Sequence, residues 1–220
     1  MSSEIIKHDH KHFLPAAGHD LLLPLYDPFV SLLGGDRARQ ELVDQGNVKP
    51  NHRILDIGCG TGTLLMLFKR RYPAAQVVGL DPDPKALSRA DKKARRAAVS
   101  VKLDRGFADK LPYEADSFDR VFSSFMFHHL EEEDREKTLS EILRVLKPGG
   151  SFHLVDFAVA GDISHGHLSC LLHASDRLKD NAPTRIIQLM QSAGFKEATK
   201  LKDGSMLFGL LRTAYYRASG

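Results

Sequence analysis

The segment Leu55–Leu65 reads LDIGCGTGTLL and places three glycines, Gly58, Gly60 and Gly62, between two apolar runs. Glycine has no Cβ, so it adopts positive φ at little cost and lets another group come close to its backbone. A glycine-rich turn between a strand and a helix is a common seat for a nucleotide-like ligand. We therefore expect a ligand site at this turn.

The rest of the chain predicts the sheet in which this turn lies. From about residue 50, short apolar strands alternate with helical patterns, which indicates βαβ units and a mostly parallel sheet. Strands are expected at 53–57, 76–81, 101–104, 119–123 and 151–157, and helices at 61–71, from 83 onward, from 131 to about 147 and at 184–193. Asp83 is a good N-cap for the second of these helices, and Pro84 is favoured at its first position.

The two ends of the chain depart from the βαβ pattern. The apolar stretches 195–202 and 206–213 are joined by Asp203-Gly204, a hairpin signal, so the sheet is expected to end in an antiparallel pair. Residues 1–50 lack the alternation and are expected to form an N-terminal helical cap on a core of residues 51–220. We interpret the whole chain, 1–220, as a single domain.

Composition narrows the classes of protein. The chain has 220 residues, 42% hydrophobic and 27% charged, which is typical of a soluble globular domain. No apolar run approaches the roughly 20 residues that span a bilayer, and the polar N-terminus lacks a secretory signal core, so we expect a cytoplasmic protein. The net charge of +3 is too small to indicate a nucleic-acid partner.

The sequence predicts no metal site. Its two cysteines, Cys59 and Cys170, form no CxxC pair, and Cys59 is interpreted as a small residue of the glycine turn. Four N-terminal histidines could suggest a metal, but their irregular spacing favours solvated side chains: His8, His10, His12 and His19.

Two acids identify the kind of ligand. A dinucleotide fingerprint is GxGxxG, whereas this turn is GxGxG and follows Asp56. A carboxylate there would repel a pyrophosphate but would suit an ammonium or sulfonium. Asp81 ends the second strand, where an acid takes the hydroxyls of a ribose. A ribose carrier without phosphates and with positive charge is S-adenosylmethionine.

Four ordered motifs support this ligand: LDIGCGTG, VVGLDPDP, GFADKLPYEADSFDRVFSS and LRVLKPGG, within residues 50–157. In these motifs the chain strongly resembles class I S-adenosylmethionine-dependent methyltransferases, especially the small-molecule group that includes ubiquinone/menaquinone C-methyltransferases. The resemblance implies an α/β, Rossmann-like fold with a seven-stranded, mostly parallel sheet, an antiparallel last strand and helices on both faces. It also implies methyl transfer from S-adenosylmethionine, leaving S-adenosylhomocysteine.

The same resemblance assigns the cofactor contacts. The turn, Cys59 included, would lie against the methionine part of the cofactor, with Asp56 near its ammonium and Asp81 on its ribose. The remaining contacts implied are Pro82, Phe107 and Ala108 around the adenine, and Ser123 and Ser124 beside the methyl group. Phe107 stands where many relatives carry an acid, so either its ring stacks on the adenine or the neighbouring Asp109 serves instead.

Three residues are candidates for chemistry on the acceptor. His128 and His129 follow the fourth strand, at the edge where open α/β sheets carry out their reactions. One of them acts as a general base, or both merely pack at the junction between loop and helix. Tyr26 is a candidate lid residue over the site, or an anchor of the cap's own core.

The acceptor is predicted only as a class. Ser123-Ser124-Phe125-Met126 replaces the Asp/Asn-Pro-Pro-aromatic motif of enzymes that methylate base amines, which argues against nucleic acid. Apolar residues after the fourth strand and in the cap would suit a small, partly apolar metabolite or a quinone-like ring. Direct displacement at the sulfonium needs no metal, and a homodimer is an open possibility. Two rival interpretations are a catalytically silent S-adenosylmethionine-binding protein and a nicotinamide-dependent reductase.

Overall fold

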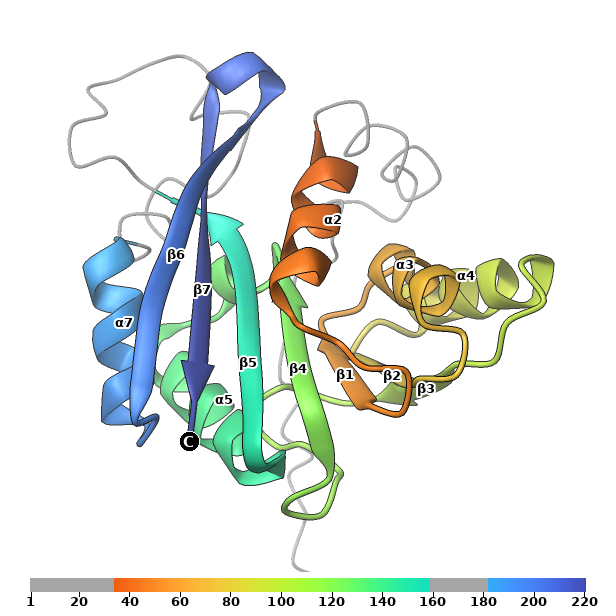
Figure 1. The fold of residues 1–220 in the computed structure, drawn as a ribbon, viewed down its shortest axis with the longest axis horizontal. Coiled ribbons are helices and arrows are strands. Elements are labelled where there is room, and N and C mark those ends of the chain that lie inside the picture. Colours follow the sequence, from red (N-terminus) through yellow and green to blue (C-terminus); the bar gives the residue numbers. More distant parts are fainter. Residues whose placement is uncertain (1–33, 159–181) are drawn as a thin grey trace, which may run out of the picture.

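A seven-stranded sheet with the order β3-β2-β1-β4-β5-β7-β6 forms the centre of the computed structural model, which describes residues 34–158 and 182–220 (Figure 1). The strands are β1 (Arg53–Ile57), β2 (Gln76–Asp81), β3 (Lys102–Arg105), β4 (Phe118–Ser124), β5 (Leu146–Phe157), β6 (Glu197–Met206) and β7 (Leu211–Ser219). β1 to β5 pair in parallel, and β7 is antiparallel to both of its neighbours. The predicted fold class is confirmed.

The strand order places the site. The chain proceeds outward from β1 through β2 to β3, then returns to add β4 on the other side of β1. This reversal opens a crevice beyond the carboxyl ends of β1 and β4, which is where open α/β sheets bind ligands. The glycine turn and the 3₁₀ turn η2 (Phe127–His129) both lie at this edge.

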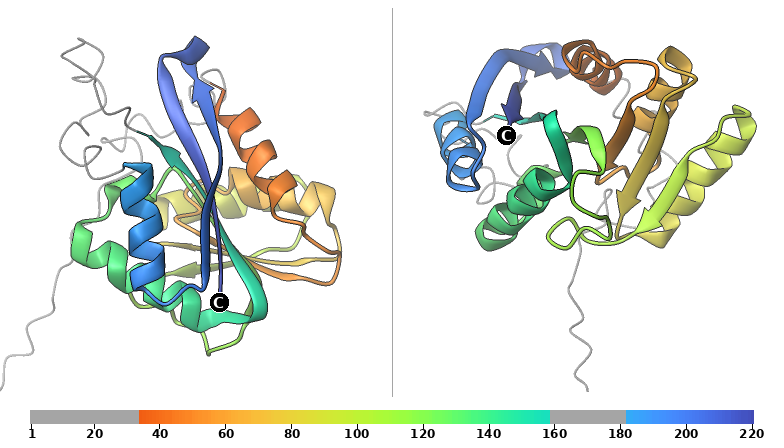
Figure 2. Two further views of the ribbon diagram at one scale, coloured as in Figure 1. Left: turned by 60° about the vertical axis from the view of Figure 1, so that its left-hand side comes forward. Right: turned by 60° about the horizontal axis from the view of Figure 1, so that its bottom comes forward.

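Helices cover both faces of the sheet (Figure 2). They are α2 (Gly35–Gln45), α3 (Thr63–Arg71), α4 (Pro84–Arg96), α5 (Glu132–Val145) and α7 (Pro183–Ser192). Alternate strand residues feed two cores: Ile54 and Val77 join the cluster with α2 and α3, whereas Leu55 and Val78 join the cluster with α5 and α7. This alternation is the period-two pattern of strands buried on both faces.

The helix termini follow their sequence signals closely. The Asp83 side chain accepts a hydrogen bond from the Lys85 N–H (2.8 Å) and Pro84 opens α4, as predicted. α3 begins at Thr63, two residues later than expected, because Gly62 occupies the N-cap with φ +80°. In the described part of the expected N-terminal cap, α2 packs on the sheet beside α3.

The predicted C-terminal hairpin exists, but its turn was placed wrongly. Asp203 and Gly204 lie within β6, opposite Ala214 and Thr213, and the turn is the 3₁₀ segment η4 (Leu207–Gly209). A Cβ at Gly204 would lie 2.6 Å from Thr213 Oγ1, so this glycine permits a close cross-strand contact. Among the described helices, none has the length and apolar character needed to cross a membrane.

Candidate active site

The glycine turn is held to the end of the neighbouring strand. The backbone N–H groups of Gly58 and Cys59 both donate to the Leu80 carbonyl of β2, at 2.9 and 3.1 Å. The Gly62 N–H donates back to the Cys59 carbonyl (2.9 Å), which closes the turn before α3 begins. Cys59 is buried, and burial raises the pKa of its thiol, so it is a packed loop residue as expected.

The three glycines serve different purposes, although all have positive φ. A Cβ at Gly58 would lie 2.3 Å from Met126 Cγ, and one at Gly62 would lie 2.8 Å from Ala90 Cβ. A Cβ at Gly60 would meet no heavy atom of the described residues within 4 Å. Gly58 and Gly62 are thus required by packing within the protein, whereas Gly60 faces open space in the described part of the chain.

Asp56, at the end of β1, carries a carboxylate without a partner. The residue is 1% exposed, and neither oxygen makes a hydrogen bond within the described residues. Burial raises the pKa of Asp56 well above its usual value; the nearby Arg39 guanidinium opposes this rise, and the Asp81 carboxylate adds to it. A buried carboxylate without hydrogen bonds is costly, so this site favours a cationic ligand.

The raised pKa of Asp56 predicts how stability depends on pH. The native carboxyl holds its proton above the unfolded pKa of about 3.9, so the native state loses stability as pH rises from there through the native pKa. We expect Asp56→Asn to remove this loss of stability. Without ligand, the Tm of the variant and the Tm of the wild type should therefore differ more at pH 7 than at pH 4. Thermal unfolding at both pH values measures the difference, and an equal difference at both would contradict the prediction.

Asp81 ends β2 and ties the turn to that strand. Its Oδ2 accepts a hydrogen bond from the Gly60 N–H (2.8 Å), and its Oδ1 accepts one from the Asp83 N–H (2.9 Å). Burial raises the pKa of Asp81, while these two N–H groups lower it. Each carboxylate oxygen keeps a second lone pair, so both can still accept from ribose hydroxyls.

The residues predicted around an adenine leave the sheet side by side. Asp81 and Arg105 are partners in the β2–β3 ladder. Pro82 comes directly after Asp81, and Phe107 comes two residues after Arg105. The Gly106 N–H donates to the Asp81 carbonyl (3.2 Å), and the Arg105 Nε donates to the Pro82 carbonyl (3.2 Å). Phe107 is half-buried, and Ala108 packs against the core on the α5 side.

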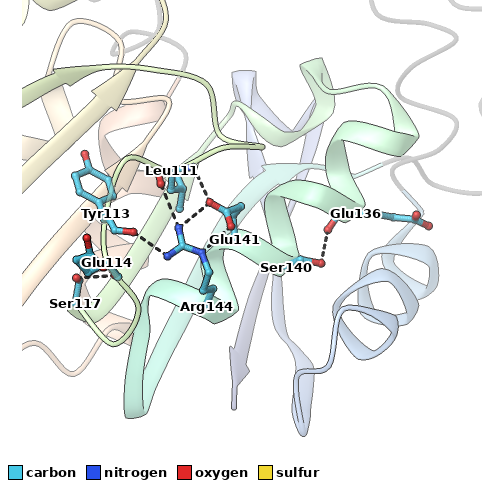
Figure 3. Close-up of polar contacts among 8 residues, drawn as sticks. All are labelled: Leu111, Tyr113, Glu114, Ser117, Glu136, Ser140, Glu141 and Arg144. Atoms are coloured by element: carbon cyan, nitrogen blue, oxygen red, sulfur yellow. Dashed lines mark hydrogen bonds and ion pairs between the residues drawn. The ribbon is translucent and has the colours of Figure 1, made fainter.

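A clamp from α5 fixes the segment that follows Phe107 (Figure 3). The Arg144 guanidinium donates to the carbonyls of Tyr113 (2.8 Å) and Leu111 (3.1 Å), and Glu141 accepts from the Leu111 N–H (2.7 Å). Arg144 also pairs with Glu141, which lowers the pKa of that carboxyl. The clamp attaches this segment to α5 and so limits the freedom of the Phe107 backbone.

Phe107 provides a test of the adenine contact. We expect Phe107→Ala to weaken cofactor binding by about 1–3 kcal/mol, the usual contribution of an aromatic side chain stacked on a base. Phe107→Asp should restore part of the loss through a hydrogen bond from the adenine amine. Calorimetry on the three proteins distinguishes these cases, and an unchanged affinity in Phe107→Ala would reject the stacking.

The last residues of β4 and those that follow it lie on the other side of the glycine turn. Ser123 is fully buried and its Oγ has no hydrogen-bond partner among the described residues, whereas Ser124 is half-buried. Phe125 adopts φ +56°, which is rare for a bulky residue and is the kind of backbone strain found at functional sites. Its ring lies 5.1 Å from that of Phe157, with the Arg39 guanidinium 5.8 Å above it.

His128 forms a buried pair with Asp156, the next-to-last residue of β5. The distance from His128 Nδ1 to Asp156 Oδ1 is 2.6 Å, and Asp156 Oδ2 accepts from the His128 backbone N–H (2.8 Å). Burial alone would raise the pKa of Asp156, but His128 and the Phe157 N–H bring it below its usual value. A carboxylate on Nδ1 orients the ring and leaves Nε2 as the available proton acceptor.

The other two catalytic candidates are less defined. The His129 ring lies 3.9 Å from that of His128, and the residue is half-buried. Tyr26 lies outside the described residues, as do the N-terminal histidines and Cys170. Among the residues that are described, no group of three His, Cys, Asp or Glu side chains is arranged to hold a metal ion.

Comparisons with known proteins agree with this geometry. Residues 54–150 match a family model described as "Methyltransferase domain". The matched segment, which runs from β1 into β5, is similar to a methyltransferase domain. The chain is 39% identical over 139 residues to the demethylmenaquinone methyltransferase of Thermus thermophilus, a match that covers 62% of each chain. The match to the Deinococcus radiodurans demethylmenaquinone methyltransferase covers 57% of that protein. The chain therefore spans less than two thirds of the length of these two curated relatives.

Solved structures extend the likeness beyond the matched segment. The fold is similar to that of Haemonchus contortus phosphoethanolamine N-methyltransferase 2, with a TM-score of 0.75 and 19% identity, covering 93% of this chain and 58% of that one. It is also similar to the cyclase SpnF, with a TM-score of 0.67 and 19% identity, covering 84% and 81%. At these identities the likeness shows the fold alone.

The sequence did not predict the contacts of four residues that lie in or beside the matched segment. Arg39 comes from α2, and no sequence signal indicated that this helix brings a guanidinium close to Asp56. Asp156 reaches His128 across 28 positions, although its place at the end of a strand was an available signal. Met126 packs on Gly58, and the buried Arg135 donates to the Leu130 carbonyl (3.0 Å), fixing the turn that carries His128.

Proposed function

We propose that this protein transfers a methyl group from S-adenosylmethionine to a small-molecule acceptor. One observation carries the proposal: the buried Asp56 carboxylate has no described hydrogen-bond partner and lies two residues before a glycine turn whose Gly60 faces open space among the described residues. A cationic ligand that approaches the turn would compensate that carboxylate. The methyltransferase domain match and the names of the relatives support the same assignment.

The residues present fit the cofactor. Asp56 would face its ammonium, Asp81 would accept from its ribose hydroxyls, and Phe107 would cover its adenine. When bound, S-adenosylmethionine supplies a methyl group already activated by a sulfonium. The protein's contribution is then to hold the acceptor in line behind that methyl group, and such positioning is worth several kcal/mol of the barrier.

For the acceptor we propose a partly apolar ring, of which a demethylmenaquinone-type naphthoquinol is the first candidate. Support comes from the rings of Phe125 and Phe157, which lie 5.1 Å apart, and from His128, whose ring meets Phe157 edge-on at 5.1 Å. These groups combine apolar area with one proton acceptor, as a hydroxylated aromatic ring requires. The name of the Thermus relative is in accord with this choice.

One experiment distinguishes a methyltransferase from a catalytically silent S-adenosylmethionine-binding protein. The purified protein is analysed by mass spectrometry for co-purified cofactor and is then incubated with labelled S-adenosylmethionine and a demethylmenaquinone-type acceptor or a metabolite extract. Formation of S-adenosylhomocysteine together with a labelled product supports the enzyme. Bound cofactor without turnover on any acceptor would favour a protein that only binds it.

The same proposal covers partners and location. We propose that the acceptor is not a nucleic acid, since Ser123-Ser124 precede Phe125-Met126 where base-amine methyltransferases carry their Asp/Asn-Pro-Pro-aromatic motif. A cytoplasmic location and a homodimer remain predictions. Sedimentation at micromolar protein concentration tests the homodimer, and a single monomeric species would reject it.

A further inference from the structure

A second pocket lies at the edge of the sheet opposite the glycine turn. It has a volume of about 120 Å³ and is lined by Arg120, Ser151, His153, Arg217 and the segment 45–47 that ends α2. Arg120 and Ser151 lie toward the amino ends of β4 and β5, and Arg217 lies near the carboxyl end of the antiparallel β7. Asp56 and Asp81 lie at the carboxyl ends of their strands, so the two sites are separate.

The sheet register brings the four side chains together. Arg120 is opposite Ser151, and His153 is opposite Arg217. Residues opposite each other in neighbouring strands project from the same face, as do residues two apart along one strand. All four therefore project from the face of the sheet that α2 covers, below the end of that helix.

Among the described residues, the pocket has two guanidinium groups and no carboxylate in its lining. Arg120 donates to two carbonyls, from Nε to Gly46 (2.8 Å) and from Nη1 to Asp119 (2.7 Å), neither of which neutralises its charge. The Asp119 carboxylate is engaged by the Arg53 N–H (2.8 Å) and by Lys147 (2.9 Å). Within the described part of the chain, Arg217 forms no ion pair. Burial lowers the pKa of Arg120; the Asp119 carboxylate opposes this shift, and Arg217 adds to it.

His153 adds an unpartnered nitrogen to this lining. The residue is 1% exposed, its Nε2 is 2.9 Å from Ser151 Oγ, and its Nδ1 has no partner within the described residues. The ring stacks on Phe122 with centroids 5.1 Å apart, which fixes its orientation. Burial and the charges of Arg120 and Arg217 lower the pKa of His153 to about 3. With Ser151 donating to Nε2, the neutral ring presents an Nδ1–H.

We propose that this pocket binds a small oxyanion, namely a phosphate group, between the guanidinium groups of Arg120 and Arg217 and the Nδ1–H of His153. Guanidinium groups match the oxygens of phosphate with paired, charge-assisted hydrogen bonds. The pocket volume of about 120 Å³ leaves room for such a group. This inference does not depend on the proposed methyl transfer.

The test is a titration with inorganic phosphate at constant ionic strength, followed by calorimetry and by the ring resonances of His153 in NMR spectra. We expect saturable binding that shifts the His153 resonances. Arg217→Gln, at an exposed position, should weaken binding at least about tenfold, the effect of losing a charge-assisted pair. Arg217→Lys should retain part of the affinity, and the matched control Arg212→Gln, also exposed on β7, should retain all of it.

A second titration distinguishes the sources of the phosphate group. Tighter binding of glycerol phosphate than of inorganic phosphate would identify a phosphorylated metabolite as the ligand, and the reverse order would identify free phosphate. The proposal is overturned if phosphate leaves the His153 resonances unchanged. It is also overturned if Arg217→Gln and Arg212→Gln weaken binding equally, since the effect would then be one of net charge.

Discussion

Gly60→Val is expected to abolish binding of S-adenosylmethionine while leaving the protein folded. The Cβ position of Gly60 is open, so no atom of residues 34–158 or 182–220 opposes a side chain there. A cofactor seated on the turn would occupy that space, and an isopropyl group would exclude it. Calorimetric titration with the cofactor should show binding by the wild type and no detectable binding by Gly60→Val.

Backbone strain must be separated from this effect, because Gly60 has φ +51°. Left-handed backbone costs a side-chain-bearing residue roughly 1–2 kcal/mol. Gly149 is a matched control: it has φ +77° and likewise no heavy atom within 4 Å of its Cβ position, and it lies at the start of β5, away from the site. Both valine variants should lose similar Tm, but Gly149→Val should bind the cofactor normally. Normal binding by Gly60→Val would show that the glycine serves only the turn.

His128→Gln is expected to lower kcat by about 10²–10⁴, the usual contribution of a general base. The physical reason is the pair with Asp156, which holds Nδ1 at 2.6 Å and leaves Nε2 to accept a proton from the acceptor. Cofactor affinity should remain unchanged, because neither residue belongs to the glycine turn. Steady-state kinetics with the acceptor found in the methyl-transfer screen measures the change.

Two further variants separate this role from packing. Asp156→Asn keeps the shape of the pair but loses its charge, so kcat should fall and the acidic limb of the pH–kcat profile should change. His129→Gln, at the neighbouring ring, should leave kcat within a few-fold of wild type. If His128→Gln keeps the wild-type kcat while losing Tm, the pair is a structural feature of the junction before α5.

The fold was predictable because its signals are local. Strand bounds at Arg53–Ile57 and Gln76–Asp81 were correct to the residue, since apolar runs and the caps at Asp83 and Pro84 delimit them. The hairpin turn was predicted at the wrong place because Gly204 is not a turn residue. It lies within β6 and leaves room for the side chain of Thr213 on the neighbouring strand. Sequence shows that a glycine is present but does not show which atom it makes room for.

The site was predictable only in part, for the same reason. The acids Asp56 and Asp81 were found because their place at strand ends is a sequence property. Arg39 and Asp156 were not, because their proximity to Asp56 and His128 depends on how α2 and β5 pack. The sequence located the glycine turn correctly after β1, but only the structure separates Gly60 from Gly58, which packing against Met126 requires.

The most direct test of the cofactor site is calorimetric titration of wild type, Asp81→Ala and the control Asp104→Ala with S-adenosylhomocysteine. We expect one site per wild-type chain, and a loss of about 1.5–3 kcal/mol in Asp81→Ala, the contribution of hydrogen bonds to a charged group. Asp104→Ala, on β3, should bind as wild type does. Absence of binding by wild type, or unchanged affinity in Asp81→Ala, would contradict the assignment of this edge of the sheet to S-adenosylmethionine.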